Sequence, residues 1–283
     1  MRRFGIVLGI VGAAIVVIAG ALALLVGFGL VPGTGGESGS SFGSGAGLGE
    51  GDSVDGDLGR LDLYEVQPDA SLNPQPRGAT ADAWDVFVRM VGADAAATEI
   101  ETFAAGDAPD SSTLAYVEEA SEPGRWTLAI NVASVADDGE LLFGTLIHEY
   151  AHVLSLAPDE FSSGGGSCPT IDVQEGCAVA DSYLWAFYEQ FWAGYEDAPP
   201  LDNVDEDVAW EFYQAHEEDF VNDYAATNVS EDFAESYTSY VLESSTSTDT
   251  VVGRKLAFFD DYPALRELRE RIRAEFAGDY GLP

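Results

Sequence analysis

The sequence predicts an α+β domain in which a small antiparallel sheet precedes a group of helices. Three observations lead to this class. Segments rich in β-branched and aromatic residues lie between residues 98 and 134, apolar residues recur at helical spacing in the segments after residue 139, and no internal repeat is visible. Because 46% of the residues are hydrophobic, the chain can bury one substantial core.

The first 32 residues are predicted to form a transmembrane anchor. Phe4 to Val31 carries no charge and exceeds the roughly 20 apolar residues that cross a bilayer. A cleaved signal peptide is the alternative, with small residues at 19–23, but cleavage there would leave an apolar stretch exposed. Arg2 and Arg3 favour a cytoplasmic N-terminus, so a single-pass cell-membrane protein is expected, with its remaining residues outside the cell.

A flexible linker is expected at residues 33–60, because this segment mixes Gly with Ser and Asp and has few large apolar side chains. The globular domain is then expected at residues 61–283. No internal repeat is visible in this range, which is predicted to be one domain.

The charge of the chain restricts its partners. It has 50 acidic residues against 12 Lys and Arg, a net charge of −38, and Lys255 is its only lysine. Such a charge repels nucleic acid and anionic membrane surfaces, so no nucleic acid is expected and the membrane is expected to be contacted only through the N-terminal helix. The acidity suits either a high-salt habitat or a cationic substrate, and composition does not separate the two.

The chain has two cysteines, Cys168 and Cys177. In an extracellular domain, such a close pair predicts a disulfide that closes the loop CPTIDVQEGC. The alternative is a metal-binding pair, which would need thiolates and a closer spacing.

The elements before residue 139 follow in order. A helix is predicted at residues 79–92, with Thr80 as its N-cap. The next segments are predicted to be a strand, a second strand, a turn and a third strand: TEIETFAAG (98–106), LAYVEEA (114–120), SEPGR (121–125) and WTLAINVAS (126–134).

A buried helix is predicted next, at residues 139–156, since this segment has apolar residues on nearly every side and no proline. On this helix His148 and His152 project from one face, one turn apart, and Glu149 lies about 100° around from His148. Two imidazoles at this spacing can hold one zinc ion beside an acid that serves as a general base. The alternative is a histidine pair satisfied by hydrogen bonds in the core.

Four more helices are expected near residues 178–195, 204–218, 230–243 and 262–277. The third of these supplies the candidate for a third zinc ligand, because Glu231 and Glu235 lie four residues apart on one helical face. Glu231 is predicted to bind zinc, and Glu235 to accept a hydrogen bond from the outer nitrogen of a ligand histidine. Ser230 is the expected N-cap.

Alternatives to this third ligand remain open. Asp232 or Glu235 could be the ligand in place of Glu231, or the helix could simply expose its acids to solvent. The third histidine, His216, is surrounded by acids and is expected to be a surface residue.

His148-Glu149-x-x-His152 followed by a helix with Glu231 resembles the gluzincin peptidases, and YAATNVSEDFAE is similar to a segment of the anthrax lethal factor and Pro-Pro endopeptidase group. The resemblance implies a zincin-like fold and a catalytic role for Tyr224, seven residues before Glu231, which would point at the substrate. The stretch between His152 and Glu231 looks long for that group, which leaves the substrate preference open.

These observations predict a membrane-anchored extracellular zinc metallopeptidase, more an endopeptidase than an exopeptidase, in which Zn²⁺ activates water and Glu149 is the general base. Its partner is expected to be a peptide or protein substrate. Two alternatives are a catalytically silent surface binding module that keeps the fold and the zinc, and a zinc-free surface protein with a coincidental motif.

Overall fold

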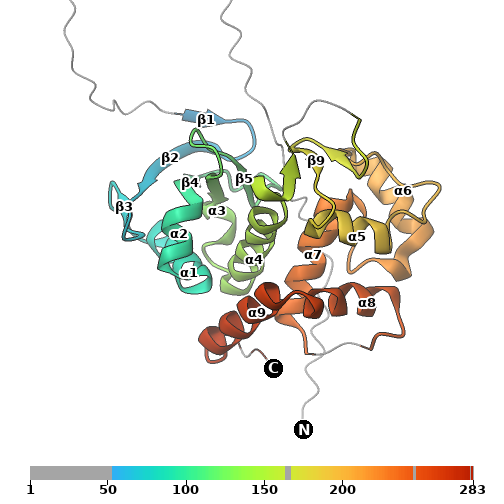
Figure 1. The fold of residues 1–283 in the computed structure, drawn as a ribbon. Helices are drawn as coiled ribbons and strands as arrows, with labels where there is room; N and C mark the ends of the chain where they lie inside the picture. The colour runs from blue at the N-terminus through green and yellow to red at the C-terminus, as the bar shows by residue number, and fades with distance from the viewer. Residues whose placement is uncertain (1–52, 163–166, 245–246, 281, 283) are drawn as a thin grey trace, which may run out of the picture.

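The computed structural model describes residues 53–162, 167–244, 247–280 and 282 (Figure 1). Within these residues the chain is a mixed α and β structure, as predicted. Two sheets are built from β1 (Ser53–Asp55), β2 (Gly59–Val66), β3 (Leu72–Asn73), β4 (Ile100–Gly106), β5 (Ala115–Glu119), β6 (Trp126–Asn131), β7 (Phe161–Ser162), β8 (Asp172–Val173) and β9 (Gly176–Ala178).

The α-helices are α1 (Ala79–Val91), α2 (Ala93–Glu99), α3 (Val132–Val135), α4 (Gly139–Ser155), α5 (Tyr183–Phe191), α6 (Glu206–His216), α7 (Val229–Leu242), α8 (Val251–Phe258) and α9 (Pro263–Phe276). Single 3-10 turns complete the described part of the chain: η1 (Pro158–Glu160), η2 (Glu217–Asp219), η3 (Tyr224–Ala226) and η4 (Phe259–Asp261). In Figure 1, α4 and α7 lie side by side between the large sheet and the C-terminal helices.

The large sheet is mixed, which corrects the predicted antiparallel sheet. Its strand order is β1-β2-β4-β6-β5, with β3 paired to β2, and β4 pairs with β6 in parallel. The predicted turn at residues 121–125 connects β5 and β6, which pair as an antiparallel hairpin. The second strand of this hairpin, not the first, pairs with β4, so the strand next to β4 runs in the same direction.

Strand structure begins before the predicted domain boundary. β1 and the first residues of β2 fall within residues 33–60, the range expected to be linker. The polar character of this stretch does not prevent pairing, because β1 is an edge strand that needs no buried face. The predicted anchor at residues 1–32 lies outside the described residues. Among the residues that are described, no helix has the length and apolar character to cross a membrane.

Two predicted helix caps are wrong. α1 begins at Ala79, so Gly78, with a left-handed φ of 58°, is the N-cap and Thr80 lies inside the first turn. α7 begins one residue earlier than predicted, and the Asn228 side chain accepts hydrogen bonds from the backbone N–H groups of Ser230 and Glu231. Asn at an N-cap is at least as favourable as Ser, so Asn228 caps the helix in place of Ser230. Ser230 is thereby freed for another contact.

The central helix α4 is buried, as predicted. Asp138 caps it by accepting from the N–H groups of Glu140 and Leu141. Aromatic side chains of α4 pack against two other helices. The ring centroid of Tyr150 lies 5.9 Å from that of Phe87 on α1, and the ring centroid of Phe143 lies 4.6 Å from that of Phe276 on α9. Such pairs add about 0.5–1.5 kcal/mol each beyond their area burial. The helix that carries both motif histidines is therefore a rigid part of the core.

Cys168 and Cys177 form the predicted disulfide, with 5.5 Å between their Cα atoms. Cys177 belongs to β9, the middle strand of the small sheet β7-β9-β8, and it pairs with Asp172 of β8. The disulfide therefore links β9 of the β8-β9 hairpin to the segment that precedes β8.

Replacing both Cys168 and Cys177 with Ala is expected to lower the free energy of unfolding by about 2–3 kcal/mol, the loop-entropy value for a ring of this size. Chemical denaturation with and without reductant measures it. Reductant should shift the midpoint of the wild type and leave the double variant unchanged. An unshifted wild type with labelled thiols would contradict this expectation.

Candidate metal centre

Helix α4 supplies two histidines to a buried polar site. His148 and His152 are each 1% exposed, and their Nε2 atoms lie 3.0 Å apart. Residues four apart on an α-helix occupy one face, so the helix by itself aims both rings at the same point. That point lies toward α7.

Helix α7 supplies Glu231, which is 3% exposed. Its Oε2 atom lies 3.2 Å from His148 Nε2 and 3.3 Å from His152 Nε2. The Asn228 cap fixes the N–H of Glu231 and thus the start of this helix. The three residues form a group that could hold a metal ion.

The separations within this group suit a small metal ion. Donors about 2.0–2.1 Å from a tetrahedral zinc ion lie roughly 3.3–3.4 Å from one another. The observed separations of 3.0, 3.2 and 3.3 Å come close to these values. Two nitrogens and one carboxylate oxygen are a donor set that zinc accepts. The residues present therefore fit a bound metal ion.

The outer ring nitrogens have partners. His148 Nδ1 lies 2.7 Å from Glu235 Oε1, and His152 Nδ1 lies 3.1 Å from Ser230 Oγ. Glu235 Oε2 in turn accepts from the Asn222 side-chain amide at 2.6 Å. With Nδ1 protonated toward these oxygens, each Nε2 lone pair faces the group centre, as a metal ligand requires. Glu235 thus lies where the sequence placed it, whereas Ser230 and Asn222 were missed as site residues.

Glu149 lies in the same buried region, and its carboxylate has no hydrogen-bond partner among the described residues. The residue is 0% exposed. Burial raises the pKa of this carboxyl to about 7, although the two histidines oppose the shift. A bound cation would lower that pKa back toward its ordinary value. An unpartnered buried carboxylate is costly for folding, and a water molecule or ligand would satisfy it.

Glu231 responds differently to burial. Desolvation alone would raise its pKa, but the charges and hydrogen bonds of His152 and His148 together lower the pKa to about 2. Two carboxyls of the same core thus differ strongly in proton affinity. Glu231 stays ionised as a ligand should, whereas the pKa of Glu149 lies near that of a general base at neutral pH.

Tyr224 lies beside the site. It begins the turn η3, is half-buried, and its ring centroid is 5.9 Å from that of His148. Asn222 Oδ1 accepts from the Ala225 N–H at 2.9 Å, while its amide contacts Glu235. One asparagine therefore ties the turn that carries Tyr224 to the partner of His148.

The alternative ligands point elsewhere. Asp232 is fully buried, but its carboxylate contacts Lys255 and Trp192 on the side of α7 that faces α5 and α8. Glu235 contacts the outer nitrogen of His148 and the Asn222 amide, and it is not part of the ligand group. His216 is half-buried, pairs with Asp197 at 3.1 Å, and does not join the group.

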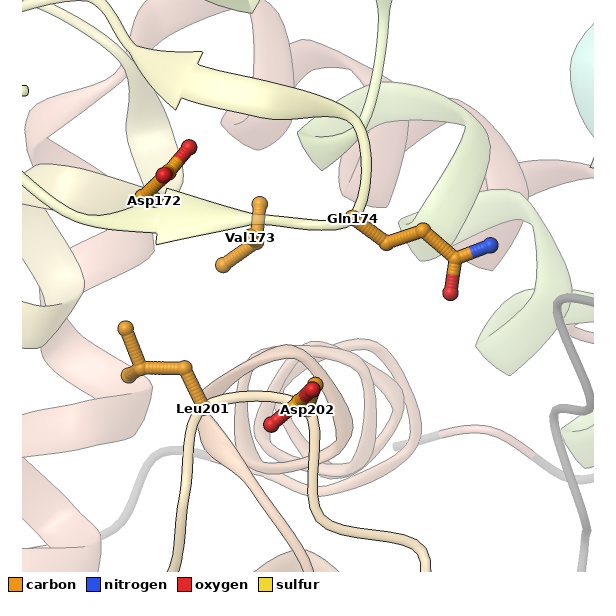
Figure 2. Close-up of a pocket in the computed structure, with 5 residues that line it drawn as sticks. All are labelled: Asp172, Val173, Gln174, Leu201 and Asp202. Atoms are coloured by element: carbon orange, nitrogen blue, oxygen red, sulfur yellow. The ribbon is translucent and has the colours of Figure 1, made fainter.

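A hollow of about 400 Å³ lies next to the disulfide-braced hairpin. Figure 2 shows Asp172, Val173 and Gln174 on one side of it, with Leu201 and Asp202 opposite. None of the candidate metal ligands lines it. The two acidic side chains give it the negative character of the rest of the surface.

No protein-family model matches the chain, and comparisons with curated proteins and with solved structures returned no match. The resemblance to the gluzincin peptidases therefore depends on the motif residues, and the chemistry of the site has to be argued from their geometry.

Proposed function

We propose that the protein is a zinc-dependent metallopeptidase of the gluzincin type, with a zincin-like fold, in which His148, His152 and Glu231 hold the zinc ion. The observation that carries the proposal is the joint burial of this ligand group with Glu149, a carboxylate that no neighbouring group among the described residues satisfies. A structural metal site would need no such acid. Hydrolysis needs one that can accept a proton.

When bound, the zinc ion supplies a Lewis acid that polarises the scissile carbonyl and lowers the pKa of water to about 7. Glu149 takes the proton of the attacking water and passes it to the leaving amine. Burial raises the pKa of Glu149 above its ordinary value, which makes this carboxylate a better proton acceptor.

The remaining residues orient the reacting groups. Glu235 and Ser230 hold the tautomers of His148 and His152. The Tyr224 hydroxyl stabilises the negative charge that develops on the carbonyl oxygen, the role that the resemblance assigns to it. Its place beside the His148 ring is compatible with that role.

The substrate is a peptide or protein, cleaved outside the cell by a chain that the N-terminal segment anchors. The strongly acidic domain would concentrate cationic substrates and repel nucleic acid. A catalytically silent zinc-binding module is the rival proposal, and a peptide-library cleavage assay on the purified protein distinguishes the two.

Glu149→Ala is expected to abolish peptide hydrolysis while keeping about one zinc ion per chain, because Glu149 is not a ligand. Glu231→Ala should lose both zinc and activity. Elemental analysis and a peptide cleavage assay, run at an ionic strength that screens the net charge of −38, provide the readouts.

The matched control is Glu140→Ala, an exposed acid on the same helix, which should change neither readout. Glu149→Ala should also unfold at the same temperature or higher, since it removes a buried unpartnered carboxylate. Stoichiometric zinc and full activity in Glu231→Ala would show that another residue is the third ligand.

Glu235→Ala is expected to weaken zinc binding by about 10–100-fold, since it removes the group that orients His148. Competition with a chromophoric chelator measures the affinity. The control is Thr238→Ala on the same helix, whose hydroxyl donates to the Ala234 carbonyl of that helix. Equal zinc affinity in both variants would show that Glu235 does not support zinc binding.

Tyr224→Phe is expected to slow kcat by about 10²–10³-fold with zinc content unchanged, because the loss of one oxyanion donor acts on the transition state alone. Tyr213→Phe, a half-buried tyrosine of α6, is the control. An unchanged kcat in the Tyr224 variant would assign the oxyanion contact to another group.

A further inference from the structure

The one lysine of this chain is buried. Lys255, on α8, is 0% exposed, although the chain carries 50 acidic residues that could pair with a lysine at the surface. Its Nζ atom lies 2.6 Å from Asp232 Oδ2 and 3.9 Å above the ring centroid of Phe220. Both partners of this ion pair are inaccessible to solvent.

Asp232 is the centre of a larger network. Besides Lys255, its carboxylate accepts from the Trp192 indole N–H at 2.7 Å and from the Ser236 hydroxyl at 3.2 Å. Trp192 is the C-cap residue of α5, and Ser236 lies one turn further along α7. Three helices therefore meet at one buried carboxylate.

The position of this carboxylate along α7 connects it to the metal centre. Asp232 follows Glu231 directly, and consecutive residues on a helix point about 100° apart. Glu231 faces the histidines of α4, whereas Asp232 faces α5 and α8. The first turn of α7 is thus held on both sides, and Asn228 fixes the backbone at its start.

A buried ion pair is a poor means of stabilising a core, because the desolvation of both charges offsets most of their attraction. Apolar side chains would join α7 and α8 at least as well, but without a preferred rotation. The Asp232 carboxylate has to meet the Lys255 ammonium and the Trp192 and Ser236 donors at the same time, and this requirement favours one rotation of α7 about its axis.

We propose that Lys255 is a positioning residue of the metal centre: through Asp232 it fixes the rotation of α7 that brings the Glu231 carboxylate to the two histidines. The inference depends on the metal site proposed above and adds a residue with no direct contact to it. A merely structural Lys255 would affect stability and leave metal affinity unchanged.

Lys255→Met tests this, because Met keeps most of the side-chain length and loses the charge. We expect zinc affinity to fall by about 10-fold or more, the lower end of the range for residues that orient ligands. The visible absorption spectrum of the cobalt-substituted protein should change as well, since it reports the geometry of the ligands.

The matched control is Leu256→Ala, the next residue on α8, which is also buried. It opens a cavity and lowers the unfolding temperature but leaves the Asp232 network intact, so its zinc affinity and cobalt spectrum should match the wild type. Trp192→Phe removes only the indole donor to Asp232, and a smaller fall of about 3-fold is expected from one lost hydrogen bond. This milder variant keeps the test valid if Lys255→Met does not fold.

The outcomes separate the two proposals. Wild-type affinity and an unchanged cobalt spectrum in Lys255→Met and Trp192→Phe would overturn the positioning role alone. An equal loss of affinity in Leu256→Ala would overturn it too, by showing that any destabilised variant loses metal. A wild-type protein that takes up no zinc would overturn the metal site, and the positioning role with it.

Discussion

The contact between α4 and α7 is the interaction on which the rest of the structure depends. Each helix carries ionisable groups on the face that meets the other, and those groups are almost fully withdrawn from water. Two imidazoles and a carboxylate would be expensive to bury separately. Brought together, they partner one another, and their lone pairs are left facing a single point that a cation can occupy.

The second ring of contacts explains why this arrangement is stable. Ser230 and Glu235 hold the outer nitrogens of the histidines, and Asn222 holds Glu235, so the rings are kept from rotating away. On another side of α7 the Asp232 network ties the same helix to α5 and α8. Glu149 is the exception, a buried carboxylate with no partner among the described residues, and unmet polar groups of this kind are found where a protein acts chemically.

Charge is divided sharply between surface and interior. Most acidic residues of the described part of the chain lie on the outside, which favours solubility at high ionic strength, while Glu231 and Asp232 are buried with specific partners. The basic residues are scarce, and the single lysine is committed to the interior. Because the chain has so few cations, the burial of its one lysine against Asp232 is a specific feature of the fold.

The sequence by itself determined the helical spacing of His148, Glu149 and His152, because a 3.6-residue period places side chains without help from the remainder of the fold. It also determined the mixed α and β class and the disulfide, each of which depends on local pattern or on a pair of cysteines without competitors. Glu231 was selected from a helix with three acids, where periodicity narrows the choice but does not complete it.

Only the tertiary structure decided what each acid of α7 meets. Neighbouring residues on that helix point to different sides, so Glu231 reaches the histidines and Asp232 reaches Lys255 according to how α7 packs. The parallel pairing of β4 with β6, the caps of α1 and α7, and the helix α8 were likewise missed. Each depends on contacts between segments far apart in the chain or on competition between neighbouring residues, and a local pattern carries no record of either.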